Sequence, residues 1–319
     1  MARNRLDEVV RMVIKEYMGH SQEAEEAALE VYSKAVSIVR DEANKLIPFN
    51  IGDGAITHKN KFIFKMGDGL VVAVDVFVFN SSLCDYENAR EVLISNGFIS
   101  VNSNTKLNRL SFYLILDENL NICKEAENDS IASLSHECLH LLQDRKGMNM
   151  SSDKYKNASM MSKSGIDQKE DVMWLIRYTV PRCAYMASKI EVGAWVQQLN
   201  SEAQRVGDVK NTRSYDDITH FIHEIAVLRH IYSMKSLYGK EIAYFDEVCK
   251  QIGYGSINGF FNEMEKAKKK YLTMIGKVMA KYHQPSGSFK QYARNEIKPK
   301  KELGNGRNKI IDKIKGFFK

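Results

Sequence analysis

The chain has 319 residues, which is enough for one large domain or two small ones with a core of ordinary size. Its hydrophobic share of 44% and charged share of 27% are typical of a globular protein and exclude a disordered or fibrous one. The net charge of +6 is concentrated in residues 296–319, where eight Lys or Arg and three Asp or Glu leave +5. A general nucleic-acid-binding surface is therefore not indicated.

Three features predict a cytoplasmic protein. The first residues, MARNRLDEVV, reach acidic side chains before any apolar segment forms, which does not fit a signal peptide. The longest apolar run, GLVVAVDVFVFN, is too short to cross a bilayer and has Asp75 at its centre. The five cysteines are scattered, odd in number and without a CxxC pair, which indicates a reducing compartment.

The first part of the chain mixes helices and strands. Hydrophobic spacing over 3–18 predicts a helix, and Ser21 offers the N-cap of a second, long helix that ends near LIPFN at 46–50. Two strands are predicted within 61–79, on either side of a Gly-Asp-Gly turn. A short helix over 86–96 and a strand over 107–117 follow.

From about residue 128 the pattern is almost wholly helical. The exception is a polar stretch over 147–165, which predicts a loop long enough to act as a lid. Helices are then expected near 170–180, 182–203, 214–237, 241–251 and 257–283. Residues 284–307 are rich in Gly, Pro, Asn and Lys and predict a linker to a short, basic amphipathic end.

The sequence SIASLSHECLHLLQDRKG at 130–147 contains two histidines four residues apart. On a helix, His136 and His140 lie one above the other and can hold one metal ion. Glu137 lies about 100° further round the helix, where it can take a proton from the attacking water and pass it to a leaving amine. This H-E-x-x-H pattern is typical of zinc-dependent hydrolases, in which zinc has three protein ligands and one open position.

The apolar residues of this segment support the interpretation. At about 100° per residue, Ile131, Leu134, Cys138, Leu141 and Leu142 form one stripe, and the two histidines lie nearly opposite it. A solvent-facing helix surface would more naturally carry Lys, Glu and Arg than histidine. The alternative is an ordinary amphipathic helix, in which the pattern arises by coincidence or from a decayed site.

HECLHLLQ resembles the active-site helix of the zincin metallopeptidases, and its H-E-x-x-H-x-x-Q form is similar to that of small uncharacterised bacterial and phage zincin-like proteins. Strands before the motif and helices after it extend the resemblance over about residues 50–205. With the predicted elements, it implies an α+β fold that is mostly α. A small mixed or antiparallel sheet and the active-site helix would form a zincin-like core, followed by a helical C-terminal half. The resemblance also implies Zn²⁺ as cofactor and a peptide or protein as substrate.

We accordingly divide the chain into four parts. These are N-terminal helices (1–50), a zincin-like catalytic core (51–205), a helical subdomain (206–283), and a linker with a basic tail (284–319). The tail could contact an acidic partner such as nucleic acid, an acidic membrane surface or a protein. The alternative is a solvated, partly frayed terminus.

The zincin branches differ in their third zinc ligand. A metzincin would have Gly and His three and six residues after the second histidine, where this chain has Gln143 and Lys146. An aspzincin would use an Asp in a Gly-x-x-Asp context, which Asp167 fits poorly. A gluzincin uses a Glu from a following helix, and the resemblance of EVGAW to its Glu-x-x-Ala pattern points to Glu191.

Glu191 also has a physical argument of its own. Its neighbours at helical spacing are mostly small or apolar, which predicts a buried carboxylate, and such a group requires a partner or a metal ion. The alternative partner is an arginine such as Arg177 or Arg182. Trp195 stands where some gluzincin families have an Asp, so the group that orients a ligand differs from theirs.

The reaction needs a donor that stabilises the oxyanion opposite the base. Tyr185 is the principal candidate, and the alternatives are Tyr178, Tyr215, His220 and His223. His220 and Glu224 lie four residues apart and could bind a metal ion themselves, although this spacing is also that of an ordinary amphipathic helix.

The sequence therefore predicts a zinc-dependent peptidase, with zinc on His136, His140 and Glu191, Glu137 as general base and Tyr185 as oxyanion donor. One alternative is a structural protein, such as a virion or assembly component, that keeps a zinc-binding zincin fold without catalysis. Another is a nucleic-acid-associated factor that uses residues 296–319. An open zinc position in a cleft lined by a strand edge would distinguish the peptidase from the structural protein.

Overall fold

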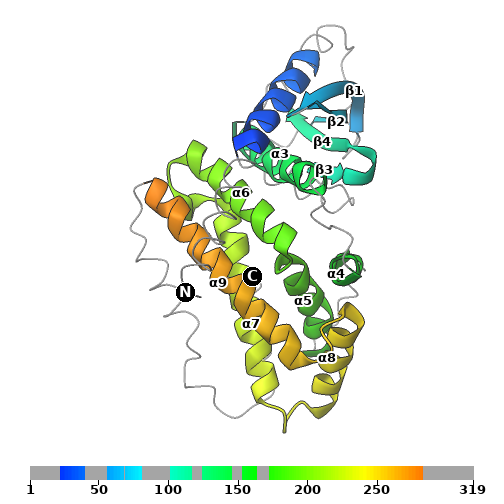
Figure 1. Ribbon diagram of the computed structural model, residues 1–319, viewed down its shortest axis with the longest axis vertical. Coiled ribbons are helices and arrows are strands. Elements are labelled where there is room, and N and C mark those ends of the chain that lie inside the picture. Colours follow the sequence, from blue (N-terminus) through cyan, green and yellow to red (C-terminus); the bar gives the residue numbers. More distant parts are fainter. Residues whose placement is uncertain are drawn as a thin grey trace, which may run out of the picture. The chain divides into compact units, whose positions relative to one another are not determined.

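The computed structural model describes residues 22–39, 56–67, 69–80, 101–116, 124–145, 153–163 and 172–282. This part of the chain is mostly helical with a small mixed sheet, which confirms the predicted α+β, mostly α class (Figure 1). The chain divides into two compact units. The first comprises Met1–Met148 and Gly193–Gly207, and the second comprises Asn149–Val192 and Asp208–Lys319.

The sheet of the first unit has the strand order β1-β2-β4-β3. Strands β1 (Ile56–Met66) and β2 (Leu70–Asn80) form the predicted antiparallel hairpin. Its turn places Gly67 and Gly69 at positive φ (52° and 89°), a conformation that favours glycine. Strand β4 (Arg109–Leu116) runs parallel to β2, and β3 (Val101–Asn104) pairs antiparallel with β4 as an edge strand.

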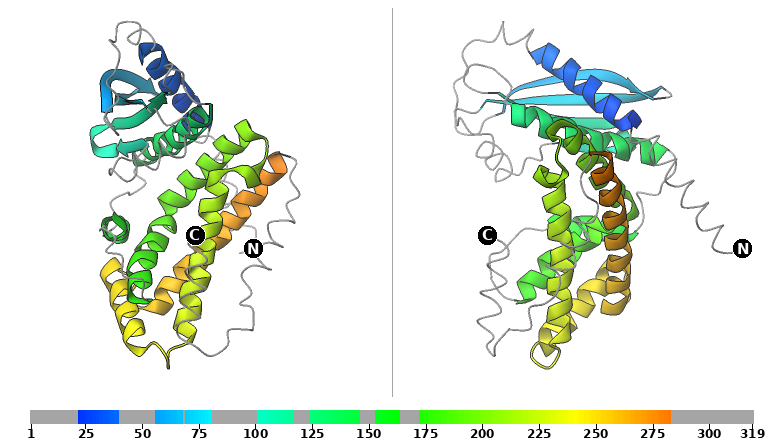
Figure 2. Two further views of the ribbon diagram at one scale, coloured as in Figure 1. Left: turned by 180° about the vertical axis from the view of Figure 1, so that it is seen from behind. Right: turned by 90° about the vertical axis from the view of Figure 1, so that its left-hand side faces the viewer.

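One face of this sheet carries the core of the first unit. The side chains of β1, β2 and β4 alternate, so that the residues of one parity, such as Phe64, Val74 and Phe112, are buried on the same side. They pack in one cluster with the helix over 22–39 and with α3 (Lys124–Arg145), which cover this face of the sheet (Figure 2). The sheet and the helix over 22–39 therefore fix the position of α3.

Helix α6 (Lys189–Val206) contacts α3 through the buried Ala194, which lies in the core cluster, and through a polar pair. The Gln197 side-chain amide donates a hydrogen bond to the buried Ser135 hydroxyl of α3, at 2.6 Å. Nearer its end, α6 reaches the helix over 22–39, where Arg205 donates to Glu25 at 2.6 Å. The buried pair of Gln197 and Ser135 favours one register of α6 against α3.

The second unit is helical in its described residues. Its elements are α4 (Asp153–Lys163), α5 (Val172–Met186), the start of α6, a 3₁₀ turn over Val209–Asn211, α7 (Arg213–Ser233), α8 (Gly239–Ile252) and α9 (Ile257–Lys281). Helix α5 packs against α7, α8 and α9, and large buried aromatic side chains such as Phe221, Phe245 and Phe260 fill the interior. The predicted helices from 214 onwards are thus confirmed, with α7 ending at Ser233.

The loop predicted over the polar stretch 147–165 is wrong for Asp153–Lys163, which form α4. The segment has no Gly or Pro to interrupt a helix, and α4 packs against α5 and α8 with Ala158 buried. A mostly polar helix of this kind has too little apolar periodicity to be recognised, because tertiary packing supplies much of its stability.

The predicted break at Pro181 is also wrong, because Pro181 lies inside α5, which continues to Met186. The helix is interrupted later, at Ala187 and Ser188, and the Glu191 backbone N–H donates to the Ser188 hydroxyl at 3.2 Å. Ser188 thus caps α6, and S-K-I-E at 188–191 matches the sequence of a capping box. Tyr185 and Glu191 consequently lie on two different helices rather than on one.

Several predicted features lie outside the described residues. They are the helix over 3–18, the helix end at 46–50, the helix over 86–96, Asp167, and the linker and basic tail over 284–319.

A buried ion pair in the second unit gives a stability prediction. The Glu224 carboxylate is fully buried and accepts a hydrogen bond from Arg182 Nη1 at 2.6 Å. Replacement of Arg182 by Met removes the positive charge, so we expect a loss of about 3–5 kcal/mol in the free energy of unfolding. Urea denaturation would measure this change.

The control for this prediction is Arg229→Met, which breaks the exposed pair with Glu265 (3.1 Å) and is expected to cost under about 1 kcal/mol. Equal effects of the two substitutions would contradict the importance assigned to burial.

Candidate metal centre

Helix α3 places the two histidines of the motif side by side in the interior. His136 and His140 are 7% and 3% exposed, and their Nε2 atoms lie 3.1 Å apart. Two nitrogens bound to one zinc ion at tetrahedral angles would lie about 3.3–3.4 Å apart. The separation expected from the four-residue spacing is therefore present in the fold.

Glu191 joins the histidines from the first turn of α6 and is fully buried. One helical turn later, the Trp195 ring packs edge-on against His136, with the ring centroids 5.4 Å apart. Because α6 is one continuous helix, this contact also brings Glu191 to His136 and His140. One ligand atom from each of the three residues lies within 4.8 Å of the other two.

Two imidazole nitrogens and one carboxylate oxygen are a donor set that holds a divalent metal ion. A metal ion would offset the cost of burying the Glu191 carboxylate, which agrees with such a role. Ligands of one tetrahedral ion lie about 3.4 Å apart, so a side-chain adjustment on the order of 1 Å would complete the geometry. The group His136, His140 and Glu191 is thus a candidate metal centre.

Gln143 orients one of the ligands. The Nδ1 atom of His140 lies 3.4 Å from Oε1 of Gln143, which is itself buried. With the proton on Nδ1, the Gln143 amide oxygen accepts a hydrogen bond from Nδ1–H, and the Nε2 lone pair is left for the metal ion. In this arrangement the glutamine of HECLHLLQ would set the tautomer and the ring orientation of His140.

This contact predicts a change in metal affinity. We expect Gln143→Ala to weaken metal binding by about 10- to 100-fold, because His140 loses the acceptor that orients it. Gln143→Glu keeps an acceptor at the same place and should retain affinity within a few-fold. Competition of each variant with a chromogenic chelator would measure the two affinities, and equal losses in both would rule out the orienting role.

The glutamate of the motif points to the sheet edge. Glu137 is half-buried, and the Ser103 hydroxyl of β3 donates to its Oε2 atom at 2.5 Å. This contact fixes one carboxylate oxygen beside the edge strand. Sequence reasoning missed both β3 and Ser103, because VNSN is short, lacks an apolar alternation and lies 34 residues before Glu137.

Trp195 contributes a second feature that sequence reasoning missed. Its indole N–H is buried and has no hydrogen-bond partner among the described residues. A tryptophan nitrogen is a donor only, and it usually finds an acceptor when buried. A donor thus lies on a ring that packs against His136, whereas the donors predicted from the sequence are all Tyr or His.

The other residues that could bind a metal ion, His220 with Glu224 and Cys138, are not part of this cluster. Within the described residues, the candidate metal cluster is the only group of three or more His, Cys, Asp or Glu that could hold an ion. His220 Nε2 lies 3.4 Å from the Glu224 carboxylate, which also forms an ion pair with Arg182 at 2.6 Å. Burial raises the pKa of the Cys138 thiol within the motif, which keeps this thiol protonated in the absence of a metal ion.

The predicted oxyanion donors all lie in the second unit. Tyr185 is half-buried in the last turn of α5, and its carbonyl accepts from the Ser188 N–H at 3.0 Å. Tyr178 stacks on Trp174 with centroids 5.7 Å apart, Tyr215 is buried in the first turn of α7, and His223 is half-buried on the same helix. The assignment of a donor stays a prediction.

No protein-family model, curated protein or solved structure matches the chain. No helix in the described residues combines the length and the apolar character needed to span a membrane. The three cysteines in these residues, Cys138, Cys183 and Cys249, are not in disulfides.

Proposed function

We propose that the chain is a zinc-dependent peptidase whose metal site is formed by His136, His140 and Glu191. The observation that carries this proposal is the convergence of three buried ligands beside Glu137, which Ser103 holds at the edge of the sheet. Three protein ligands and a neighbouring carboxylate are the set that zinc hydrolases use.

Zinc in this position would polarise the scissile carbonyl and lower the pKa of the attacking water. The remaining chemistry belongs to the side chains. Glu137 removes a proton from the water as it attacks the carbonyl carbon, and then delivers that proton to the nitrogen of the departing amine. Because Ser103 occupies one carboxylate oxygen of Glu137, the other oxygen is available to the water.

The edge strand β3 gives the proposal a substrate class. Its one partner in the described sheet is β4, so its other side can pair with an extended chain. An unfolded or extended peptide is therefore the expected substrate, and Tyr185 is the proposed donor to the oxyanion. The Trp195 N–H is a second candidate for that role.

A structural zinc site is the alternative, and one observation favours it. The three ligands are at most 7% exposed, and a structural site is closed to solvent whereas a catalytic one keeps a position open to substrate. In this alternative the metal ion would stabilise the fold and no peptide would be cut.

Metal analysis and a cleavage assay, both on the full chain, test the peptidase and the structural zinc site. The peptidase predicts about one zinc per chain and cleavage of an unfolded protein such as casein, lost with a chelator and restored by zinc. If the protein contains no stoichiometric zinc, and the His136→Ala variant has the same metal content, both the peptidase and the structural zinc site are contradicted. Stoichiometric zinc without cleavage of any unfolded protein would instead support the structural site.

A further inference from the structure

The outer face of the sheet in the first unit is exposed and carries both cationic and aliphatic side chains. It is opposite to the face that packs on α3, so it is separate from the metal centre. Lys61 and Ile63 of β1 pair in register with Asp75 and Ala73 of β2, and Ala73 pairs in turn with Arg109 of β4. These residues form one continuous surface, which we call the outer sheet face.

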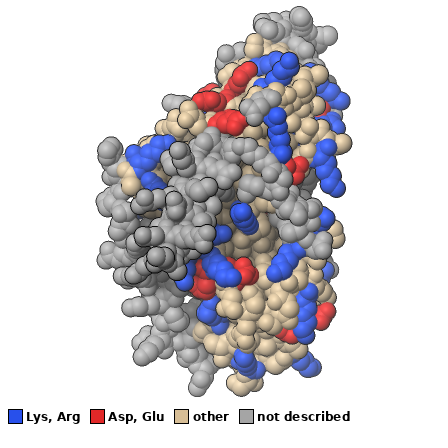
Figure 3. All heavy atoms as spheres, viewed as in Figure 1, with Lys and Arg blue, Asp and Glu red and all other residues tan. Residues whose placement is uncertain are grey.

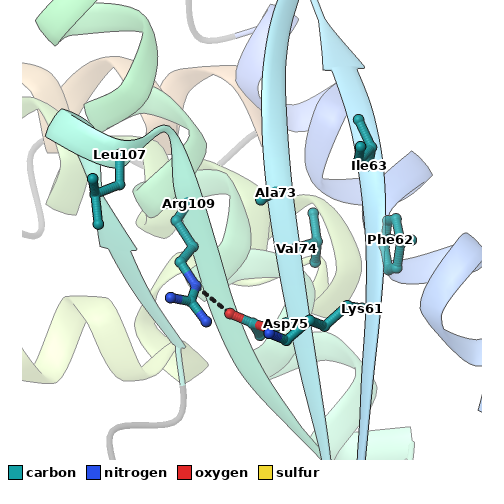
Figure 4. A pocket seen from close by; sticks show the side chains of 8 residues that line it. All are labelled: Lys61, Phe62, Ile63, Ala73, Val74, Asp75, Leu107 and Arg109. Carbon is teal, nitrogen blue, oxygen red and sulfur yellow. Dashed lines mark hydrogen bonds and ion pairs between the residues drawn. The ribbon is translucent and has the colours of Figure 1, made fainter.

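The outer sheet face is hollowed by an open pocket of about 410 Å³. The pocket is lined by Lys61, Phe62, Ile63, Ala73, Val74, Asp75, Leu107 and Arg109 (Figure 4). Two of its aliphatic residues, Ile63 and Leu107, are 65% and 66% exposed, which is unusual for side chains of this size. A pocket of this volume is large enough for one or two side chains of a partner.

A buried carboxylate holds the cations of this pocket in place. Asp75 is almost fully buried and forms ion pairs with Arg109 and, at 3.7 Å, with Lys61 Nζ (Figure 4). Side chains that are already fixed lose less entropy when they bind a further anionic group. Arg109 is therefore preorganised at the rim of an apolar hollow, with Lys61 near the same carboxylate.

The charge of the outer sheet face is unbalanced. Lys65 on β1 and Lys106 before β4 are exposed and add to Lys61 and Arg109, whereas Asp75 is the one acidic residue among those that line the pocket. Lys and Arg side chains line the right-hand margin of the upper part of the view in Figure 3. A ligand complementary to this surface carries negative charge next to an aliphatic group.

We propose that the outer sheet face docks an acidic segment of a protein partner. An aliphatic side chain of that segment fills the pocket between Ile63, Ala73 and Leu107, and its carboxylates contact Lys61, Lys65 and Arg109. This docking does not depend on the metal centre or on any peptidase activity.

Two other classes of macromolecule fit the surface less well. Single-stranded nucleic acid is bound on exposed aromatic rings, but Phe77 and Tyr113 of this face stack on each other at 5.0 Å and burial raises the pKa of Tyr113. A membrane surface requires apolar groups that protrude, whereas Ile63 and Leu107 border a hollow. Both classes are nevertheless included as arms of the test.

The test measures binding of the full chain to a fluorescein-labelled amphipathic peptide of Glu and Leu by fluorescence anisotropy. The other probes are a Lys and Leu peptide of the same pattern, oligothymidylate, and vesicles of phosphatidylcholine and phosphatidylserine. We expect saturable binding of the acidic peptide that weakens with salt, and no comparable binding of the other three.

Variants locate the binding on the outer sheet face. Lys61→Glu with Lys65→Glu should weaken binding by about tenfold or more, and Ile63→Ser should weaken it several-fold at the same salt concentration. If charge reversal disturbs the fold, the neutral pair Lys61→Gln with Lys65→Gln replaces it in the binding measurement. The control pair, Lys240→Glu with Lys277→Glu, changes exposed lysines of α8 and α9 and should leave binding within twofold.

Three outcomes would overturn the proposal. They are the absence of binding of the acidic peptide to the unchanged chain, equal losses in the control pair, and an unchanged affinity in the Lys61 and Lys65 variants. If oligothymidylate or vesicles bind more tightly than the acidic peptide, and those same variants lose this binding, the ligand of the outer sheet face is nucleic acid or a membrane instead of an acidic segment.

Discussion

Replacement of Glu137 by Gln is expected to leave the metal content unchanged and to abolish most peptide hydrolysis. The glutamine keeps the size of the side chain and can still accept the Ser103 hydrogen bond, but it cannot take a proton from water. General-base catalysis of this kind contributes about 10²- to 10⁴-fold, so we expect kcat/KM to fall by that factor. Cleavage of a quenched fluorescent peptide, with zinc measured on the same sample, would test this.

Two further variants distinguish a loss of catalysis from a loss of structure. Glu127→Gln changes a glutamate earlier on α3 and should leave kcat/KM unaffected. Ser103→Ala removes the hydrogen bond to the Glu137 carboxylate, which should lower kcat by about tenfold because such a bond to a charged group is worth about 1.5 kcal/mol or more. Full activity of the Glu137→Gln variant would exclude Glu137 as the base, and loss of its metal would assign Glu137 a binding role instead.

The metal cluster could be predicted because its determinants are local. His136 and His140 are brought together by the four-residue repeat of a single helix. The apolar stripe of that helix is buried, and so are the two histidines on the side nearly opposite to it. The small and apolar neighbours of Glu191 predict a buried carboxylate, and its complete burial confirms that part of the argument. The predicted helix that carries Glu191, however, begins too early, at residue 182 instead of Lys189.

The wrong helix boundary at Pro181 and the missed role of Ser103 both depend on contacts that hydrophobic periodicity does not reveal. The sequence predicts that a helix ends before Pro181, but α5 continues past this residue and buries its ring. The capping serine, Ser188, gives a local signal for the true boundary, in the S-K-I-E sequence. Ser103 has no such signal, since its role depends on a short edge strand that exists only by pairing with β4.

The site brings a carboxylate close to two histidines in the protein interior. Helix α3 packs on the sheet, and the Gln197 amide of α6 donates to the Ser135 hydroxyl of α3. The Glu191 carboxylate is fully buried. A metal ion bound beside it would offset the cost of burying its charge. Folding and metal binding should therefore be coupled.

We accordingly expect removal of the metal ion to lower the melting temperature, and only in chains that have all three ligands. At a free zinc concentration about a thousand times the dissociation constant, binding adds about 4 kcal/mol to the stability of the native state. This corresponds to a shift of roughly 10 °C for a unit of this size. Thermal denaturation with zinc and with a chelator would measure the shift.

The identity of the third ligand can be read from the same experiment. Glu191→Gln removes the charge, so the melting temperature of this variant should respond weakly to zinc and should not fall when the chelator is added. Glu25→Gln is the matched control, because it alters another buried glutamate of the chain, paired with Arg205, and should keep the full zinc response. A Glu191→Gln variant that responds to zinc like the unchanged protein would remove Glu191 from the site and return Asp167 to consideration.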